Sequence, residues 1–183
     1  MKEKLKQDQA DRKICFYNKD LSDNDYFVNG HYYVTNDLSL LHTSVDGNFS
    51  IFLAGNWRYT LLADIKTKRC LSFSAYLDGL KFKYCHLQLP PNKKGMLMFS
   101  YNHAVPAGEC DYLLLKDQCV LDFDNQLLCI GDNLAVGQAV EFAEDSYAVI
   151  DNGVFVSLYL ILPSEINSKI LNMSDINTNW EVV

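Results

Sequence analysis

A chain of 183 residues can bury one sizeable core, and nothing in its composition calls for a second domain, so we expect residues 1–183 to form a single domain. The formal net charge of −7 argues against a nucleic-acid partner, because proteins bind phosphates through clustered lysines and arginines. The longest continuous apolar candidate, Val154 to Leu162, is too short for a membrane span, which argues against a membrane protein.

The start of the chain gives no sign of export. Met1 to Asp8 carries the positive charge of a signal peptide, but no apolar stretch of the needed length follows. We therefore expect a cytoplasmic protein, and most of the six cysteines lie in apolar runs that favour buried, reduced thiols. Residues 1–13 are polar on nearly every side, which predicts a flexible or weakly docked segment.

Two short strand regions are predicted before the centre of the chain. Tyr26 to Thr35 is interrupted at Asn29-Gly30 and predicts a short hairpin. Phe49 to Leu53 predicts another strand, which begins after a turn at Asp46 to Asn48.

The stretch from Trp57 to Leu89 predicts a three-stranded antiparallel meander, because its alternating apolar residues agree once the turns are set. A three-residue first loop, Lys66 to Lys68, pairs Ile65 with Arg69, Ala63 with Leu71, Leu61 with Phe73 and Tyr59 with Ala75. Lys68 is the weak point of this prediction, because such a loop normally has glycine at its last position.

The second turn of the predicted meander is Asp78-Gly79, where glycine accepts a positive φ without cost. A tight hairpin there places Leu77 opposite Leu80, Ala75 opposite Phe82 and Phe73 opposite Tyr84. One face of all three strands is then largely apolar.

The next segment alternates between loops and strands. Pro90 to Gly95 predicts a surface loop, since proline cannot donate to a sheet. Met96 to Tyr101 and Tyr112 to Lys116 predict strands on either side of a turn at Pro106 to Gly108. Leu134 to Phe142 fits a helix about as well as a strand.

Two further hairpins are predicted in the second half. A loop at Asp124-Asn125 puts Phe123, Leu121 and Cys119 on the same face as Gln126, Leu128 and Ile130. The Asn152-Gly153 dipeptide is the strongest short hairpin signal in the chain, and it places Val149 opposite Val156 and Ile150 opposite Phe155. Both faces of this last pair are apolar, so we expect it to lie centrally.

Ser164 is a suitable N-cap for a short helix that runs to about Met173. Roughly nine to twelve strands and one or two helices are counted in total. We therefore predict an all-β, mainly antiparallel fold, either a sandwich or a partly open barrel, with a C-terminal helix at about 164–173.

The sequence contains no common catalytic or nucleotide-binding motif. Cys85-His86 is an unlikely nucleophile and base, because adjacent strand residues point to opposite faces. No cysteines and histidines have the close spacing of a structural zinc site, and the acidic loop that contains Asp122 and Asp124 lacks EF-hand spacing. We assign no catalytic residue, no metal ligand and no cofactor.

A protein partner is the favoured hypothesis. Glu141, Glu144 and Asp145 form an acidic cluster at a turn, and Tyr32 and Tyr33 belong to a surplus of aromatic residues. The ordinary interpretations are a solvated turn for the acidic residues and core packing for the tyrosines. The functional interpretation is a partner-binding surface made of these five residues, which would attract a basic protein.

Three functions remain open at this point. The first is a non-enzymatic cytoplasmic protein-binding module that works through the acidic surface or an exposed sheet edge, and an inhibitor or immunity-type protein that neutralises a basic partner is one form of it. The second is a small β-barrel that binds an apolar ligand. The third is an enzyme of unrecognised type that uses a cysteine or a carboxylate pair.

Overall fold

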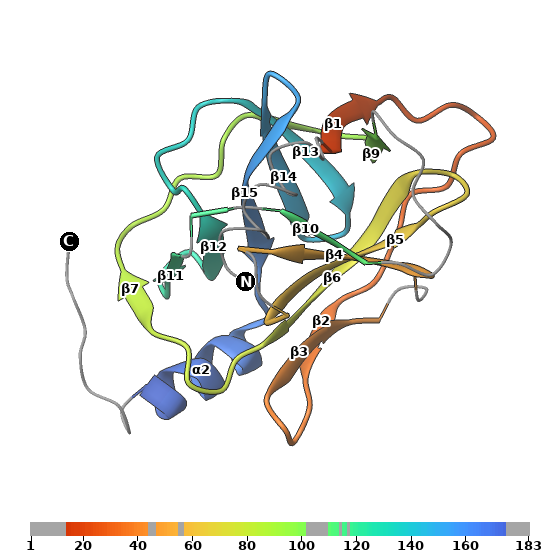
Figure 1. Ribbon diagram of the computed structural model, residues 1–183. Coiled ribbons are helices and arrows are strands. Elements are labelled where there is room, and N and C mark those ends of the chain that lie inside the picture. Colours follow the sequence, from red (N-terminus) through yellow and green to blue (C-terminus); the bar gives the residue numbers. More distant parts are fainter. Residues whose placement is uncertain are drawn as a thin grey trace, which may run out of the picture.

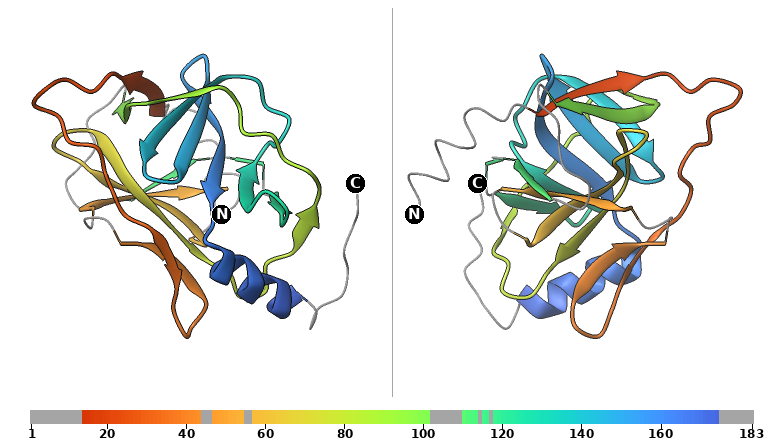
Figure 2. Two further views of the ribbon diagram at one scale, coloured as in Figure 1. Left: turned by 180° about the vertical axis from the view of Figure 1, so that it is seen from behind. Right: turned by 45° about the vertical axis from the view of Figure 1, so that its right-hand side comes forward.

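The computed structural model describes residues 14–43, 47–54, 57–101, 110–113, 115, 116 and 118–174. They form two β-sheets that pack face to face, and one helix lies across an end of this sandwich (Figures 1 and 2). The predicted all-β, mainly antiparallel sandwich with a C-terminal helix is confirmed. The expectations for residues 1–13 and for the turn at 106–108 lie outside the described residues.

The first sheet has eight strands in the order β1-β9-β6-β5-β4-β10, with β3 also beside β6 and β2 beside β3. Its strands are β1 (Ile14–Lys19), β2 (Tyr32–Val34), β3 (Ser39–His42), β4 (Phe49–Leu53), β5 (Tyr59–Asp64), β6 (Arg69–Tyr76), β9 (Met96–Tyr101) and β10 (Asp111–Leu113).

The second sheet has seven strands in the order β7-β11-β12-β15-β14-β13-β8. Its strands are β7 (Phe82–Tyr84), β8 (Asn92–Lys94), β11 (Cys119–Asp122), β12 (Leu127–Gly131), β13 (Gln138–Ala143), β14 (Ser146–Asp151) and β15 (Val154–Ile161). The β14–β15 hairpin lies at the centre of this sheet, as its apolar faces predict.

The main core fills the space between the sheets. Phe16 of β1 and Phe155 of β15 are each 1% exposed, and their ring centroids lie 5.3 Å apart. Phe49 and Phe99 stack in the same core with a centroid distance of 5.9 Å. The first contact joins the two sheets, and the second joins β4 and β9, which are separated by β5 and β6 within the first sheet.

The second sheet also buries its outer face. Alternate residues of β12 divide between the main core and a smaller outer cluster, because successive strand residues point to opposite faces. Cys129 and Tyr159 belong to the outer cluster and are 0% and 1% exposed. The segment that follows β7 covers this face, where Leu87 packs against the cluster.

The β5–β6 hairpin has the predicted register over most of its length. Leu61 pairs with Phe73 as expected, but a β-bulge shifts Ala63 from Leu71 to Cys70. The loop therefore has four residues instead of three. Its last residue, Lys68, has a φ of 59°, the left-handed conformation that glycine adopts most easily.

The predicted pairing around Asp78-Gly79 is wrong, although the turn itself forms. Leu80 donates a hydrogen bond of 3.2 Å to the Leu77 carbonyl, and Gly79 has a φ of 65°. β7 pairs with β11 in the second sheet and not with β6. The reason is that β3 already occupies that edge of β6, so the chain crosses to the other sheet.

Three other local predictions also need correction. Asn92 to Lys94 forms an edge strand parallel to β13, where a surface loop was expected after the prolines. Tyr26 to Thr35 is no hairpin, because β2 pairs with β3 instead. In the β14–β15 hairpin Ile150 faces Phe155 as predicted, but a bulge places Val149 opposite Ser157.

The strand predicted at Tyr112 to Lys116 is observed as β10 at Asp111–Leu113, and the fold has more strands than the nine to twelve expected. The β11–β12 hairpin and the C-terminal helix agree with prediction. In the β11–β12 hairpin, Leu121 faces Leu128 and Cys119 faces Ile130. Helix α2 (Ser164–Ser174) buries Ile166 and Ile170. No helix in the described part of the chain is long and apolar enough to cross a membrane.

The left-handed residue at the end of the β11–β12 loop provides a test of this backbone. Gln126 has a φ of 56°, so Gln126→Gly should raise the free energy of unfolding by up to about 1 kcal/mol, because glycine removes the steric cost of that conformation. Urea denaturation measures the change.

The control is Lys66→Gly in the β5–β6 loop, where the residue has no positive φ. This control should lower the free energy of unfolding, because glycine adds entropy to the unfolded chain. Equal losses in both variants would contradict the loop geometry.

Candidate functional site

The five predicted partner-binding residues come from both sheets, because Glu141, Glu144 and Asp145 lie at one end of the second sheet and Tyr32 and Tyr33 lie in β2 of the first sheet. Glu144 and Asp145 form the turn between β13 and β14, and Glu141 precedes them in β13. Tyr33 is 41% exposed, whereas Tyr32 is 2% exposed and its hydroxyl shares a 2.5 Å hydrogen bond with the Ser146 hydroxyl. Tyr32 is therefore a core residue and not a surface anchor.

Glu144 holds the loop before β2, which contains Val28 and Gly30, against this turn through hydrogen bonds. Its Oε2 accepts a 2.8 Å hydrogen bond from the Gly30 backbone, and its own N–H donates one of 2.8 Å to the Val28 carbonyl. The His42 ring lies 3.2 Å from the Glu144 carbonyl, and Val28 forms a bridge with Ala143. All of these contacts are made within the chain, and none of them indicates a partner. Partner binding by the acidic turn therefore stays a prediction.

The three carboxylates of this turn share one cation. Burial raises the pKa of Glu141, Lys94 opposes that rise, and the charges of Asp145 and Glu144 add to it. Burial also raises the pKa of Asp145, and so does the charge of Glu144. Lys94 Nζ lies 4.0 Å from Glu141 Oε1, which leaves the turn with an excess of negative charge.

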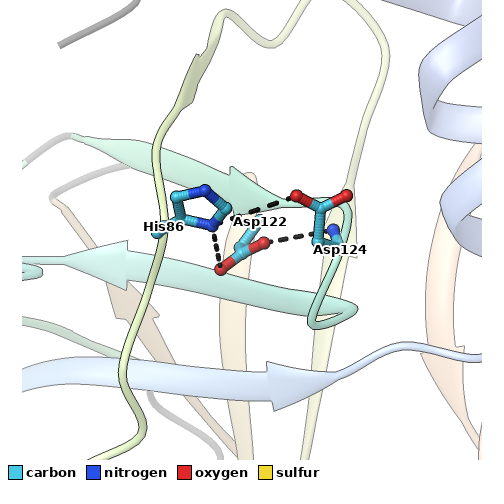
Figure 3. A group of neighbouring side chains, drawn as sticks. All are labelled: His86, Asp122 and Asp124. Carbon is cyan, nitrogen blue, oxygen red and sulfur yellow. Dashed lines mark hydrogen bonds and ion pairs between the residues drawn. The ribbon is translucent and has the colours of Figure 1, made fainter.

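A second polar group was missed from the sequence. His86 follows β7, Asp122 ends β11, and Asp124 lies in the turn after it (Figure 3). His86 Nδ1 lies 3.7 Å from Asp122 Oδ2 and 4.0 Å from Asp124 Oδ2. The His86 and Asp124 side chains are 76% and 69% exposed, whereas that of Asp122 is 0% exposed.

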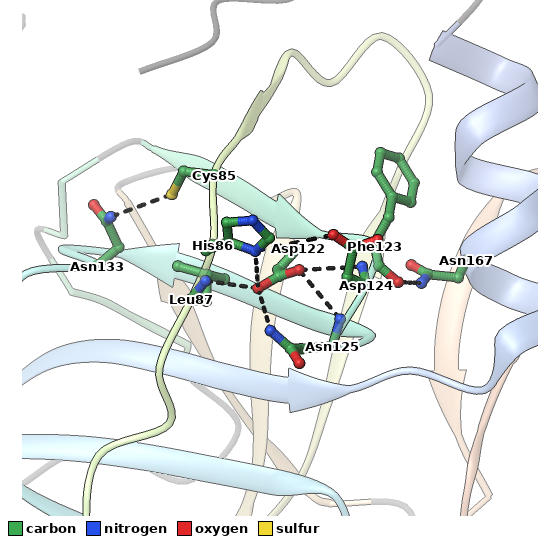
Figure 4. Close-up of polar contacts among 9 residues, drawn as sticks. All are labelled: Cys85, His86, Leu87, Asp122, Phe123, Asp124, Asn125, Asn133 and Asn167. Carbon is green, nitrogen blue, oxygen red and sulfur yellow. Dashed lines mark hydrogen bonds and ion pairs between the residues drawn. The ribbon is translucent and has the colours of Figure 1, made fainter.

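Hydrogen bonds fix the buried Asp122 carboxylate (Figure 4). Oδ2 accepts 2.7 Å from the Leu87 backbone and 2.8 Å from Asn125 Nδ2, and Oδ1 accepts 3.1 Å from the backbone of both Asp124 and Asn125. Burial by itself would raise the pKa of Asp122, but the hydrogen bonds from Leu87 and Asn125, with the His86 charge nearby, hold this pKa below that of an ordinary aspartate. The carboxylate thus connects the crossing segment to the hairpin.

Cys85 does not join His86 as a nucleophile and base. Its Sγ accepts a long contact of 3.8 Å from Asn133 Nδ2, while His86 points toward Asp122 and Asp124 (Figure 4). Burial, followed by the charge of Asp122, raises the pKa of Cys85, which disfavours the reactive thiolate.

The third feature is a cleft at the other end of β13, β14 and β15. It has a volume of about 310 Å³ and is lined by Leu115, Lys116, Asp132, Ala135, Val136, Asp151, Val154, Phe155 and Val156. Gly131 lies beside it with a φ of 107°, and a Cβ there would lie 2.4 Å from Leu115 Cδ2 and 2.6 Å from the Val156 carbonyl oxygen. Glycine is therefore required for the close approach of these strands.

Two exposed valines line the cleft, and an exposed leucine lies in the loop beside it. Val136 is 87% exposed and Leu134 is 80% exposed, both in the loop before β13, and Val154 after the β14–β15 turn is 55% exposed. Lys116 Nζ forms an ion pair of 3.4 Å with Asp132, and Asp151 adds a second carboxylate. The stretch from Leu134 to Phe142, predicted as helix or strand, contains a loop followed by β13, and no sequence pattern indicated this cleft.

Comparison with known proteins adds no assignment. No protein-family model matches the chain. No curated protein matches it either.

Asp122→Asn tests the structural role of the buried carboxylate. The amide places a donor against the donors Leu87 N–H and Asn125 Nδ2, so the free energy of unfolding at pH 7 should fall by about 2–3 kcal/mol. Urea denaturation of both proteins between pH 7 and pH 3 measures the difference.

The pH dependence follows from the lowered pKa of Asp122. As pH falls, Asp122 of the unfolded chain takes up a proton before Asp122 of the folded protein does. The stability that the ionised carboxylate contributes is therefore complete above the ordinary carboxyl pKa and is lost as pH falls through the folded-state pKa. The difference in free energy of unfolding between wild type and Asp122→Asn should therefore become smaller at acidic pH. A constant difference would contradict this role, and the exposed Asp78→Asn serves as the control.

Proposed function

We propose that the protein is a non-enzymatic, cytoplasmic binding module that recognises a basic protein through the cleft beside Val136 and Val154. The observation that carries the proposal is that the exposed side chains of Val136 and Val154 line a cleft, with the exposed Leu134 in the loop beside it. Exposed apolar patches rimmed by polar groups are typical of protein interaction sites. Val136 and Leu134 would become buried in the complex.

The size of the cleft favours an inserted side chain over a free ligand. Its volume of about 310 Å³ is at the lower limit of pockets for drug-sized ligands, about 300–1,000 Å³. An open cleft of this size accommodates one or more apolar side chains of a partner, and anchors of this kind contribute most of the affinity at many interfaces. This consideration places the apolar-ligand alternative second.

The charges at the cleft favour a basic partner. Asp132 and Asp151 face the single cation Lys116, which is already paired with Asp132. The chain as a whole has a formal net charge of −7, and the turn at Glu144 and Asp145 adds to this negative field. Complementary charge steers a basic protein and raises its association rate.

Addition of a partner strand is the less favoured route. The edge strands β2, β7, β8 and β10 have three residues each, and β8 carries exposed Lys93 and Lys94. The longer edge strand β1 (Ile14–Lys19) has its Phe16 N–H already bonded to the Gly153 carbonyl. Short edges with lysines are the usual means by which proteins prevent strand addition. An inhibitor that covers a basic protein is thus the form of binding we favour.

The proposed location also agrees with the thiols. All six cysteines are free. Burial raises the pKa of Cys70 and that of Cys129, the latter to about 12, so both stay in the unreactive thiol form. Buried, unreactive thiols are what we expect of a protein in a reducing compartment.

Val136→Arg tests the proposed surface. The change places a positive charge and removes apolar area at a residue that is 87% exposed, so the fold should remain intact. Immobilised wild type should retain a basic protein from the native host in a salt-sensitive manner, and Val136→Arg should lose it. With the purified partner, the Kd should rise by at least about tenfold.

Trp57→Ser is the matched control, because Trp57 is 62% exposed and lies in the turn before β5 of the first sheet. This control should bind the partner as wild type does. Equal binding by Val136→Arg, or the absence of any partner together with a small apolar molecule in the cleft, would overturn the proposal.

A further inference from the structure

Three possible metal ligands converge where the chain crosses the outer face of the second sheet (Figure 3). One ligand atom each from His86, Asp122 and Asp124 lies within 4.8 Å of the other two. The histidine comes from the segment after β7 and the two aspartates from the β11–β12 hairpin, so the fold and not local spacing brings them together.

The distances fit a small divalent ion. Two ligand atoms that bind zinc tetrahedrally at about 2.1 Å lie about 3.4 Å apart. His86 Nδ1 is 3.7 Å from Asp122 Oδ2 and 4.0 Å from Asp124 Oδ2, which is too long for hydrogen bonds and a few tenths of an ångström wider than that separation. A small rotation of the exposed His86 and Asp124 side chains closes the difference.

The central ligand is held in place before any ion arrives. Leu87 N–H and Asn125 Nδ2 donate to Asp122 Oδ2, and the backbones of Asp124 and Asn125 donate to Asp122 Oδ1 (Figure 4). An ion at Oδ2 takes the place of the bond from the Asn125 side chain, while the three backbone bonds still orient the carboxylate. Hydrogen bonds of this kind orient the ligands of metal sites and strengthen binding. Burial of Leu87 in the outer cluster positions the adjacent His86.

The donor set selects the class of ion. One imidazole nitrogen and two carboxylate oxygens suit zinc and the neighbouring divalent transition metals, whereas calcium takes six to eight oxygen ligands. Exposure of His86 and Asp124 leaves the outer side of the site open to water, which can complete the coordination.

We infer that His86, Asp122 and Asp124 form a binding site for one divalent transition-metal ion of the zinc class. A bound ion would link the segment after β7 to the β11–β12 hairpin at the protein surface. This link adds to the buried hydrogen bonds that Asp122 already makes between the two. This inference is independent of the proposed partner surface, which lies at the other end of β12.

Calorimetric titration of the full chain with Zn²⁺, after removal of bound metal with a chelator, tests the site. Wild type should bind one equivalent, and His86→Gln and Asp124→Asn should each weaken binding by at least about tenfold. Both side chains are largely exposed, so the fold should survive, and circular dichroism checks this. Asp122 is left unchanged because the hairpin depends on it.

Two controls identify the ligands. His31→Gln removes an exposed histidine on the loop before β2 and should bind Zn²⁺ as wild type does. Cys85→Ser should also keep the affinity, because its thiol contacts Asn133. Absence of saturable binding to wild type, unchanged affinity in His86→Gln or Asp124→Asn, or loss of binding in Cys85→Ser would each overturn the inference.

Discussion

The fold depends on the closure of one strand edge. β3 pairs with β6 along Leu40 and Ala75, so the chain that leaves β6 after Tyr76 finds no free edge beside it. The tight turn at Asp78-Gly79 then directs the chain into the opposite sheet, where β7 pairs with β11. Phe73 and Phe82 consequently belong to one core but come from different sheets, where the predicted meander placed them in the same sheet.

This crossing also explains the buried carboxylate. After β7 the chain runs over the outer face of the second sheet and buries Leu87 there, where its N–H has no strand partner. A buried donor without an acceptor would cost free energy, and Asp122 supplies the acceptor. The same carboxylate closes the β11–β12 turn through Asp124 and Asn125. One side chain thus satisfies both the crossing segment and the hairpin.

Local patterns predicted much of this architecture, and contacts between distant segments account for the errors. The registers of Leu61 with Phe73 and of Leu121 with Leu128 follow from alternation and turn residues, which are properties of neighbouring residues. The destination of β7 depends on the occupancy of the β6 edge, which alternation does not reveal. His86 reaches Asp122 only because β7 pairs with β11. In the sequence, the acidic turn at Asp122 and Asp124 was therefore the only sign of this group. The cleft was missed for the same reason, because its walls come from four separate segments.

Three of the strand pairings are parallel: β7 with β11, β8 with β13 and β10 with β4. Each joins segments tens of residues apart and lies at the border of a sheet, whereas the hairpins close over a few residues. Closing a loop over such a span loses chain entropy before the stabilising contacts of the strand pair can form. We therefore expect the hairpins to assemble early and the borders to be added last, which makes the borders the first parts to open when the native protein fluctuates.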